Sequence, residues 1–291
     1  MTRPRCCTFT NNVRHDSSMV QVPPPLDTAL AAVEIALRAL PNWDYRISEG
    51  IARAVDEVVD PIRSGRWQVA DLDQPEKTVI GIRVENLLRM ELELERGQKL
   101  DLRVAGEEVD VKFSMRGEWM IPHEAFGHLC LLTSFDEQKQ SVSAGLLRTS
   151  VDSLRPSQNQ DKKRQVSAVG KTRVKWLIQN RIPQTSIIGF MASMDLDTRA
   201  AVTDSSVSAQ QRINRLFLAI KMTPIPETVV HAIAQGHEDW KRRMRKDASN
   251  KSSPEKVGYD VLRQSSPKDR KTLKHLGLPP LDRGYCMSIE V

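Results

Sequence analysis

Apolar and polar residues alternate between residues 100 and 114, in the way that is typical of two short strands joined by a tight turn. The apolar side chains recur at every second position, at Leu100, Leu102, Val104, Val109, Val111 and Phe113. Ala105-Gly106 lies between the two runs, and glycine supplies the positive φ that a hairpin turn requires. A turn centred there places Asp101 opposite Asp110, and the two-residue period of a strand puts Lys112 on the same face.

This pair of carboxylates predicts a bound cation, because two like charges opposed on a sheet repel each other. Mg²⁺ prefers oxygen ligands and is commonly held by one or two carboxylates, waters and phosphate oxygens. A lysine beside such a site can meet a phosphate as a point charge, or orient and help to deprotonate a water. Asp101, Asp110 and Lys112 therefore outline a site for metal-assisted phosphodiester hydrolysis. The alternative is a solvated face on which Lys112 only neutralises the carboxylates, because Asp-x-Lys alone is a common pattern.

A helix is predicted immediately upstream of this hairpin, over residues 84–95. Its apolar residues have helical spacing, at Val84, Leu87, Leu88 and Met90. Glu85 would lie near the start of that helix, where backbone N–H groups favour a carboxylate. Such a helix could direct Glu85 towards the carboxylate pair. The alternative is that Glu85 only complements the helix dipole.

The spacing of these acidic residues is similar to that of a known family. Glu85, Asp101 and Asp110-Val111-Lys112, at intervals of 16 and 9 residues, resemble the catalytic set of NaeI-type (type IIE) restriction endonucleases. Similar flanking segments are Glu76-Lys77-Thr78, Gly81, Val84-Glu85, Lys112-Phe113-Ser114-Met115, Trp119-Met120, Pro122, Gly127-His128, Cys130, Ala144-Gly145-Leu146, Gln211–Phe217 and Leu276–Pro279. The resemblance runs from about Arg63 to Arg283, and it is specific because it joins an active-site spacing to long flanking similarity.

The resemblance implies an α/β (mixed) restriction-endonuclease-like core with a PD-(D/E)xK-type site, followed by a mainly α, winged-helix or helix-turn-helix-like DNA-binding domain. It implies a Mg²⁺-dependent enzyme that hydrolyses double-stranded DNA at a palindromic site and leaves a 5′-phosphate and a 3′-hydroxyl. Asp101 and Asp110 would hold the metal, and Lys112 would orient and activate the attacking water. Glu85 would complete the outer shell of the metal or position Lys112.

The predicted function also implies which molecules the protein binds. Cutting both strands of a palindrome calls for a two-fold homodimer. The resemblance implies that the C-terminal domain binds a second DNA copy as an effector, so that two DNA sites serve one functional unit. A self-toxic nuclease needs a cognate DNA methyltransferase, which we expect as a genetic partner and not in a stable complex. Two alternatives stay open: a catalytically silent DNA-binding regulator, and a repair nickase that cuts one strand on the same core.

The pattern of polarity along the chain predicts four segments. Residues 1–24 are polar and aperiodic and are expected to form a disordered arm. Residues 25–154 are expected to form the catalytic domain, with helices over 26–40 (capped by Asp27) and 48–59, and strands of one mixed sheet over 127–134 and 141–147. Residues 155–170 have almost no apolar content and are predicted to be a linker. Residues 171–291 then form the C-terminal DNA-binding domain.

Helices dominate this C-terminal part, over residues 173–180, 208–221, 226–234 and 238–246. The second of them is expected to expose the polar side chains Gln210, Gln211, Arg212, Asn214 and Arg215. Arg, Asn and Gln suit bidentate contacts with base edges, although an ordinary solvated face has the same content. The last two helices have the spacing of a helix-turn-helix whose second member carries Lys241, Arg242 and Arg245. Strands over 259–262 and 285–291 could form a wing, and which helix would enter the major groove stays open.

Charge is unevenly distributed between the two halves of the chain. From residue 155 onwards there are 25 Lys+Arg against 13 Asp+Glu, whereas the preceding part has 18 against 24. The basic half indicates that much of the DNA affinity lies there, although a solubilising surface would also be basic. The sequence has no apolar run of transmembrane length, no signal-peptide pattern and no zinc or disulfide framework among its four cysteines. We therefore expect a cytoplasmic bacterial protein with no membrane partner.

Overall fold

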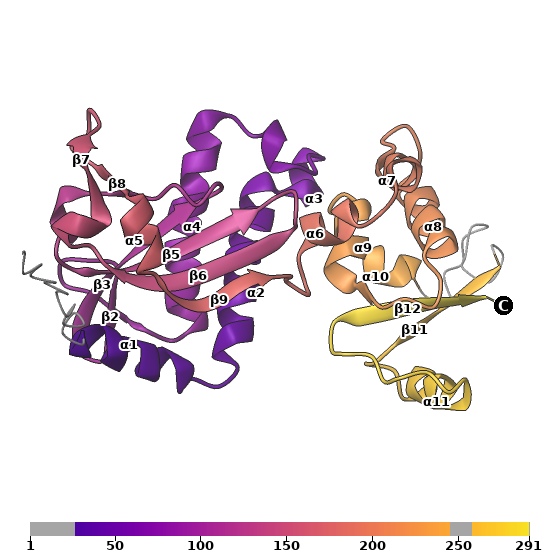
Figure 1. The fold of residues 1–291 in the computed structure, drawn as a ribbon. Helices are drawn as coiled ribbons and strands as arrows, with labels where there is room; N and C mark the ends of the chain where they lie inside the picture. The colour runs from indigo at the N-terminus through magenta and orange to yellow at the C-terminus, as the bar shows by residue number, and fades with distance from the viewer. Residues whose placement is uncertain (1–26, 245–257, 291) are drawn as a thin grey trace, which may run out of the picture.

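The computed structural model describes residues 27–244 and 258–290. The expected arm over residues 1–24 and the candidate residue Arg245 lie outside the described residues. The described chain forms two lobes, which Figure 1 shows on the left and the right, joined by the segment that follows β9 (Lys175–Arg181). Helices and several sheets make up the fold, which agrees with the mixed α/β class that the sequence predicts.

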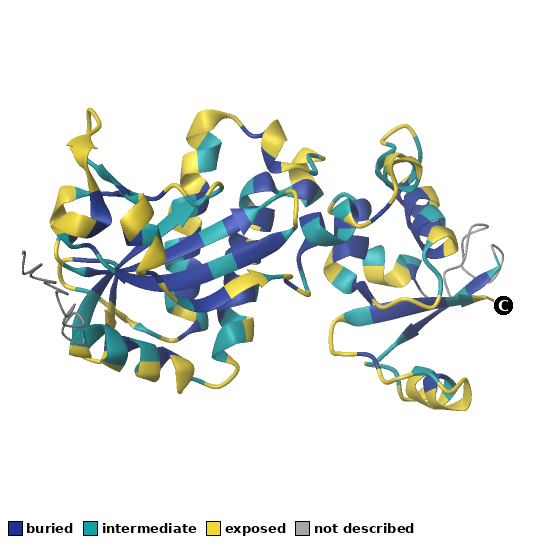
Figure 2. Ribbon diagram, viewed as in Figure 1, coloured by how far each residue is buried: buried dark blue, intermediate teal, exposed yellow. Residues whose placement is uncertain are grey.

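A six-stranded sheet forms the centre of the N-terminal lobe, in the order β1-β2-β3-β5-β6-β9. Its first five strands along the chain are β1 (Glu95–Arg96), β2 (Leu102–Val104), β3 (Glu107–Ser114), β5 (Leu129–Asp136) and β6 (Ser141–Arg148). β3 runs parallel to β5 and the other neighbours are antiparallel, so the sheet is mixed, as predicted. Figure 2 shows that its central strands, β5 and β6, are largely buried.

The β2–β3 hairpin has the register that the sequence predicts. Leu102 pairs with Val109, and Val104 pairs with Glu107. Both turn residues have a positive φ, 51° at Ala105 and 85° at Gly106, which is the combination that a type I′ turn requires. The turn therefore fixes which side chains of β3 face the core and which face the candidate site.

Three long helices pack on the sheet: α1 (Thr28–Arg38), α2 (Trp43–Val59) and α4 (Gln74–Glu91), with the short turns α3 (Pro61–Ser64) and η1 (Val69–Asp71) between the last two. Their apolar side chains share one core with those of β2, β3, β5 and β6. Asp27 caps α1 as predicted, because its carboxylate accepts a hydrogen bond of 3.0 Å from the backbone N–H of Leu30. α2 begins five residues before the predicted start at residue 48.

The prediction for the start of α4 is wrong. The helix begins at Gln74 and not near Val84, because Asp73 and Glu76 form a capping box there. Glu85 therefore lies about three turns inside the helix. Its position cannot be explained by the free N–H groups of a helix start, and it must instead be explained by its neighbours in space.

The predicted linker over residues 155–170 is also a structured part of the N-terminal lobe. It forms β7 (Leu154–Gln158) and β8 (Arg164–Val166), which join β4 (Met120–Ile121) in a second sheet of order β4-β8-β7. The short helices η2 (His123–Ala125), η3 (Val151–Ser153) and α5 (Ala168–Thr172) accompany it. The segment folds despite its polarity because Leu154, just before it, pairs with Val166, and both side chains are buried in a common core.

The helix predicted over residues 173–180 is a strand, β9, which pairs with the edge of β6. Val174, Leu177 and Ile178 are buried by this pairing, so tertiary contacts outweigh the local preference of the segment. The central sheet therefore extends to Arg181, beyond the predicted boundary at residue 154.

The C-terminal lobe consists of α6 (Ile187–Ala192), α7 (Leu196–Thr203), α8 (Ala209–Ala219), α9 (Glu227–Ile233), α10 (Trp240–Arg243) and α11 (Pro267–His275), with a sheet of β10 (Ile225–Pro226), β12 (Tyr285–Glu290) and β11 (Tyr259–Arg263). The predicted helix over 208–221 and the predicted C-terminal strands are present. α9 and α10 lie where the helix-turn-helix pair was predicted, but both are shorter. Among the described residues, no helix is both long and apolar enough to cross a membrane.

Two carboxylates of α2 hold the connection between the lobes. Glu49 accepts hydrogen bonds from the backbone N–H groups of Gln184, at 2.7 Å, and Thr185, at 2.9 Å. Asp56, which is only 7% exposed, accepts bonds from the N–H groups of Ile187, at 2.8 Å, and Ile188, at 3.1 Å. Burial nevertheless raises the pKa of Asp56 to about 7, partly offset by these donors.

This raised pKa predicts that Asp56 makes stability depend on pH. Between pH 4 and 7 the folded protein keeps a proton on Asp56 that the unfolded chain has lost, so stability falls as pH rises through this range. The loss is at most about 4 kcal/mol, since one pKa unit corresponds to about 1.4 kcal/mol. Asp56→Asn mimics the protonated form, and we expect its melting temperature to fall less than that of the wild type between pH 5 and 7.5. The exposed change Asp71→Asn is the control; equal pH dependence in all three proteins would contradict the prediction.

Candidate active site

Lys112 lies between two carboxylates on one face of the β2–β3 hairpin. Its Nζ is 2.8 Å from Oδ2 of Asp110 and 3.8 Å from Oδ2 of Asp101, and it donates a hydrogen bond of 2.9 Å to the carbonyl of Val111. The structure therefore brings together the three hairpin residues that the sequence singled out. The predicted register of the turn is the cause, because it carries Asp101 to the position opposite β3.

Asp101 is held at both its side chain and its backbone. Its Oδ2 accepts a hydrogen bond of 2.7 Å from the backbone N–H of Val111. The residues just before it are fixed by Glu108, whose carboxylate accepts bonds from the N–H groups of Gln98, at 2.9 Å, Lys99, at 3.1 Å, and Leu100, at 2.9 Å. Asp101 therefore directly follows a segment whose backbone is hydrogen-bonded to a side chain of β3.

Asp110 is the most buried acidic side chain of the hairpin, and it is 3% exposed. Burial raises its pKa to about 6; the attraction of Lys112 opposes this shift and the repulsion of Asp101 adds to it. Cys130, its neighbour on β5, donates a weak hydrogen bond of 3.7 Å to Oδ2. A carboxylate so deeply placed and so near another one is stabilised in its charged form by additional positive charge.

The pKa values of Lys112 and Glu85 are also shifted by their surroundings in the site. Burial alone would lower the pKa of Lys112, but the charges of Asp110 and Asp101 outweigh it and raise the pKa above its ordinary value. The pKa of Glu85 is raised by burial and by the charge of Asp101, against the opposing charge of Lys112. Glu85 therefore lies within electrostatic reach of the site, as expected.

The sequence implies a bound Mg²⁺, so the side chains of the site can be compared with the ligands that this ion prefers. Across residues 27–244 and 258–290, no three Asp, Glu, His or Cys side chains gather closely enough to hold a metal ion by themselves. A part for Glu85 in holding the metal therefore stays a prediction. Asp101 and Asp110 still fit the ion, because Mg²⁺ usually keeps several waters and takes only one or two carboxylates with phosphate oxygens.

Two site residues escaped the sequence reasoning. Glu108 precedes Asp110 by two residues, so the period of the strand places it on the same face, which is the sequence signal that could identify it. Cys130 was noted only as a similarity to a family. Its contact with Asp110 depends on the parallel pairing of β3 with β5, which no local pattern indicates.

Comparison with known proteins shows to which family the chain belongs. A family model described as restriction endonuclease NaeI matches residues 33–291. The chain belongs to the NaeI restriction endonuclease family. A relative, the type II restriction enzyme NaeI of Lentzea aerocolonigenes, is 28% identical over 269 residues, which cover 91% of this chain and 84% of the relative. Membership confirms the expected class of enzyme, a type II restriction endonuclease and therefore a deoxyribonuclease.

Five polar residues of α8 were predicted to form an exposed face that could contact bases. For three of them the predicted exposure is wrong. Gln210, Arg212 and Asn214 are buried. Arg212 donates to the carbonyls of Ile233, at 2.8 Å, and Val207, at 2.7 Å, and the hydroxyl of Tyr259 donates to Asn214 at 2.7 Å. These polar groups therefore form hydrogen bonds inside the lobe instead of facing solvent.

The other residues that were predicted to contact DNA have different surroundings. Gln211 is exposed and completes the capping box of α8, while Arg215 pairs with Asp204 at 3.1 Å. Lys241 and Arg242 are exposed on α10, and Lys241 lies over the ring of Trp240. A contact with DNA by any of these four residues stays a prediction.

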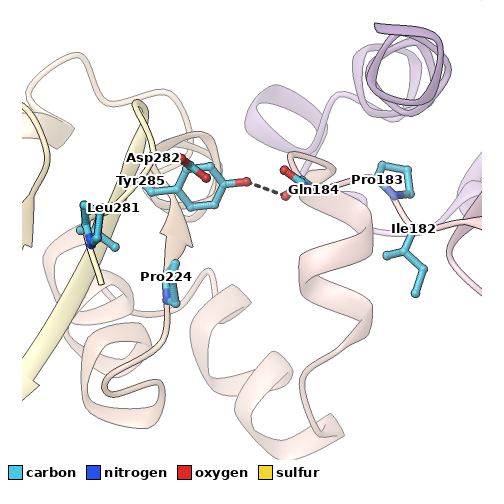
Figure 3. Close-up of a pocket in the computed structure, with 8 residues that line it drawn as sticks. Ile182, Pro183, Gln184, Pro224, Leu281, Asp282 and Tyr285 are labelled. Atoms are coloured by element: carbon cyan, nitrogen blue, oxygen red, sulfur yellow. Dashed lines mark hydrogen bonds between the residues drawn. The ribbon is translucent and has the colours of Figure 1, made fainter. Parts of the chain in front are cut away.

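A hollow of about 400 Å³ lies between the two lobes, away from the hairpin. It is lined by Ile182, Pro183, Gln184, Pro224, Pro280, Leu281, Asp282 and Tyr285. Figure 3 shows the ring of Tyr285 pointing across it, where the hydroxyl donates a hydrogen bond of 2.8 Å to the carbonyl of Gln184. Asp282 is the one carboxylate among its lining residues, so the hollow has no pair of carboxylates like that of the hairpin, and it belongs to the junction between the lobes.

Proposed function

We propose that this protein is a Mg²⁺-dependent, sequence-specific endonuclease that hydrolyses both strands of double-stranded DNA at a palindromic site. The observation that carries the proposal is Lys112 placed between Asp101 and Asp110, in a chain of the NaeI restriction endonuclease family. A solvated face would not bury Asp110 to 3% exposure beside a second carboxylate. The arrangement has its natural use in holding a cation and a phosphate.

Each residue then has a separate task. Asp101 and Asp110 would hold Mg²⁺, and Glu85 would act through its outer shell of water or by positioning Lys112. When bound, Mg²⁺ polarises the phosphate and lowers the pKa of a coordinated water. Lys112 keeps its proton at neutral pH, because its pKa is raised. It therefore orients the water and offsets the developing phosphorane charge, and does not serve as the base. The water oxygen bonds to phosphorus as the bond from phosphorus to the 3′-oxygen breaks; the proton of the water passes to solvent and the leaving 3′-oxygen takes one up, which leaves a 5′-phosphate and a 3′-hydroxyl.

The assembly follows from the substrate. Two active sites related by a two-fold axis match the two strands of a palindrome, so we propose a homodimer. The C-terminal domain would bind a second DNA copy as an effector, through its basic residues, among which Lys241 and Arg242 are exposed. A cognate DNA methyltransferase would protect the bacterial host, in whose cytoplasm the enzyme acts.

Digestion of plasmid and phage DNA by the purified protein, with Mg²⁺ or with EDTA, tests the proposal. We expect discrete double-strand fragments with Mg²⁺ and none with EDTA, and faster cutting of a one-site plasmid when a short duplex carrying the site is added. Nicking alone would favour the repair nickase. A mobility shift without cleavage would favour the regulator and would overturn the proposal.

A further inference from the structure

The carboxylate of Glu108 is hydrogen-bonded to a turn of backbone. Three successive N–H groups, from Gln98, Lys99 and Leu100, donate to its two oxygens at 2.9, 3.1 and 2.9 Å. Consecutive N–H groups that converge in this way form a concave anion site, and here a side chain of the protein itself occupies it.

This turn has no space for a side chain at its first residue. A Cβ added to Gly97 would lie 2.6 Å from Oε2 of Glu108 and 2.4 Å from the carbonyl oxygen of Leu100. Both distances are shorter than real Cβ contacts allow, so the turn as it stands requires glycine at this position. The tight fit shows that the turn and the carboxylate are shaped to each other.

This turn ends at Asp101. The last N–H group bound by Glu108 belongs to Leu100, whose side chain is buried, and the next residue is Asp101. The side chain of Asp101 is in turn fixed by the N–H group of Val111, one residue after Asp110 on β3. Glu108 and Asp110 share a face of β3 because they are two residues apart. One strand therefore supplies Asp110 and also the group that sets the backbone before Asp101.

We propose that Glu108 is a positioning residue that sets the separation of the two carboxylates, Asp101 and Asp110, that receive Mg²⁺. The inference rests on the proposed function, in which these two residues hold the metal. Glu108 itself does not touch the metal or the DNA; it acts through the backbone of residues 98–100. Partners of this kind, which orient a metal ligand from behind it, typically change metal affinity or activity by about 10- to 100-fold when they are replaced.

Glu108→Gln tests this role, because an amide keeps the size of the side chain but turns an NH₂ group towards at least one N–H donor. We expect the Mg²⁺ concentration for half-maximal cleavage to rise about 10- to 100-fold. We also expect the cleavage rate at saturating Mg²⁺ to stay within a few-fold of the wild type. Binding of Tb³⁺ to the DNA-free protein, followed by its luminescence, should weaken in parallel. Glu107→Gln is the matched control, since it removes the same charge from the adjacent position of β3.

Gly97→Ala is a second, chemically independent variant, which disturbs the same turn without changing any charge. It should shift Mg²⁺ dependence and Tb³⁺ binding in the same direction as Glu108→Gln, and it carries the test if Glu108→Gln does not fold. Unchanged metal dependence in both variants would overturn the inference, as would a loss of stability that lowers the rate equally at every Mg²⁺ concentration or prevents both from folding. If the wild type binds Tb³⁺ but cuts no DNA, the proposed function fails, whereas the effect of Glu108 on metal binding can still be measured.

Discussion

Asp110→Asn is expected to abolish Mg²⁺-dependent cleavage in a protein that still folds and binds DNA. The change removes the carboxylate that lies deepest in the site and 2.8 Å from Lys112. A metal ion supplies several kcal/mol of transition-state stabilisation, and each 1.4 kcal/mol corresponds to a tenfold change in rate. We therefore expect a decrease of about 1000-fold or more, measured as the initial rate of plasmid linearisation at saturating Mg²⁺.

The direction in which this substitution changes the stability of the folded protein can also be predicted. The folded-state pKa of Asp110, about 6, is above the ordinary aspartate value, so the ionised carboxylate opposes folding at pH 7.5. A neutral asparagine removes that cost, and the melting temperature should not fall. Asp152→Asn, which changes an exposed aspartate of the same lobe, is the control. Cleavage by the Asp110→Asn enzyme at the rate of this control would rule out the proposed mechanism.

The sequence could predict the hairpin because the information is local. A glycine turn and a period of two decide both the register and the shared face of Asp110 and Lys112. Glu85 was brought near the site for a different reason from the one predicted, since the capping box of α4 lies at Asp73 and Glu76. Its spacing from the hairpin was informative, whereas the supposed helix start was not.

The C-terminal lobe was harder to predict because its polar residues are satisfied at long range. A helical pattern distinguishes apolar from polar positions, and by this pattern Arg212 belongs on the solvent face. In the structure it donates to the carbonyl of Ile233, 21 residues further along the chain, and is 3% exposed. The linker prediction for residues 155–170 is wrong for a related reason, because the buried apolar side chains that hold this segment are few: Leu154 just before it and Val166 within it.

Lys112→Met is expected to separate cleavage from metal binding. Removing the ammonium group takes away the donor that orients the water and offsets charge at the phosphate, and loss of one such donor typically lowers the rate by about 10²- to 10³-fold. Metal affinity should change in the opposite direction. Nζ of Lys112 competes for Oδ2 of Asp110 at 2.8 Å and adds positive charge beside Asp101. Without it, both carboxylates become available to a cation, and Tb³⁺ should bind the DNA-free protein several-fold more tightly.

Asp110→Asn and Lys112→Met should therefore lower cleavage together but move Tb³⁺ affinity in opposite directions, down for the first and up for the second. Lys139→Met is the matched control, because Lys139 also pairs with an aspartate, Asp136, at 3.1 Å, but on an exposed surface of the same lobe. It should change neither property. A Lys112→Met enzyme that loses metal affinity along with activity would mean that the lysine holds the two carboxylates in place. Lys112 would then be a structural neutralising charge of the hairpin, and the water would have to be oriented by another group.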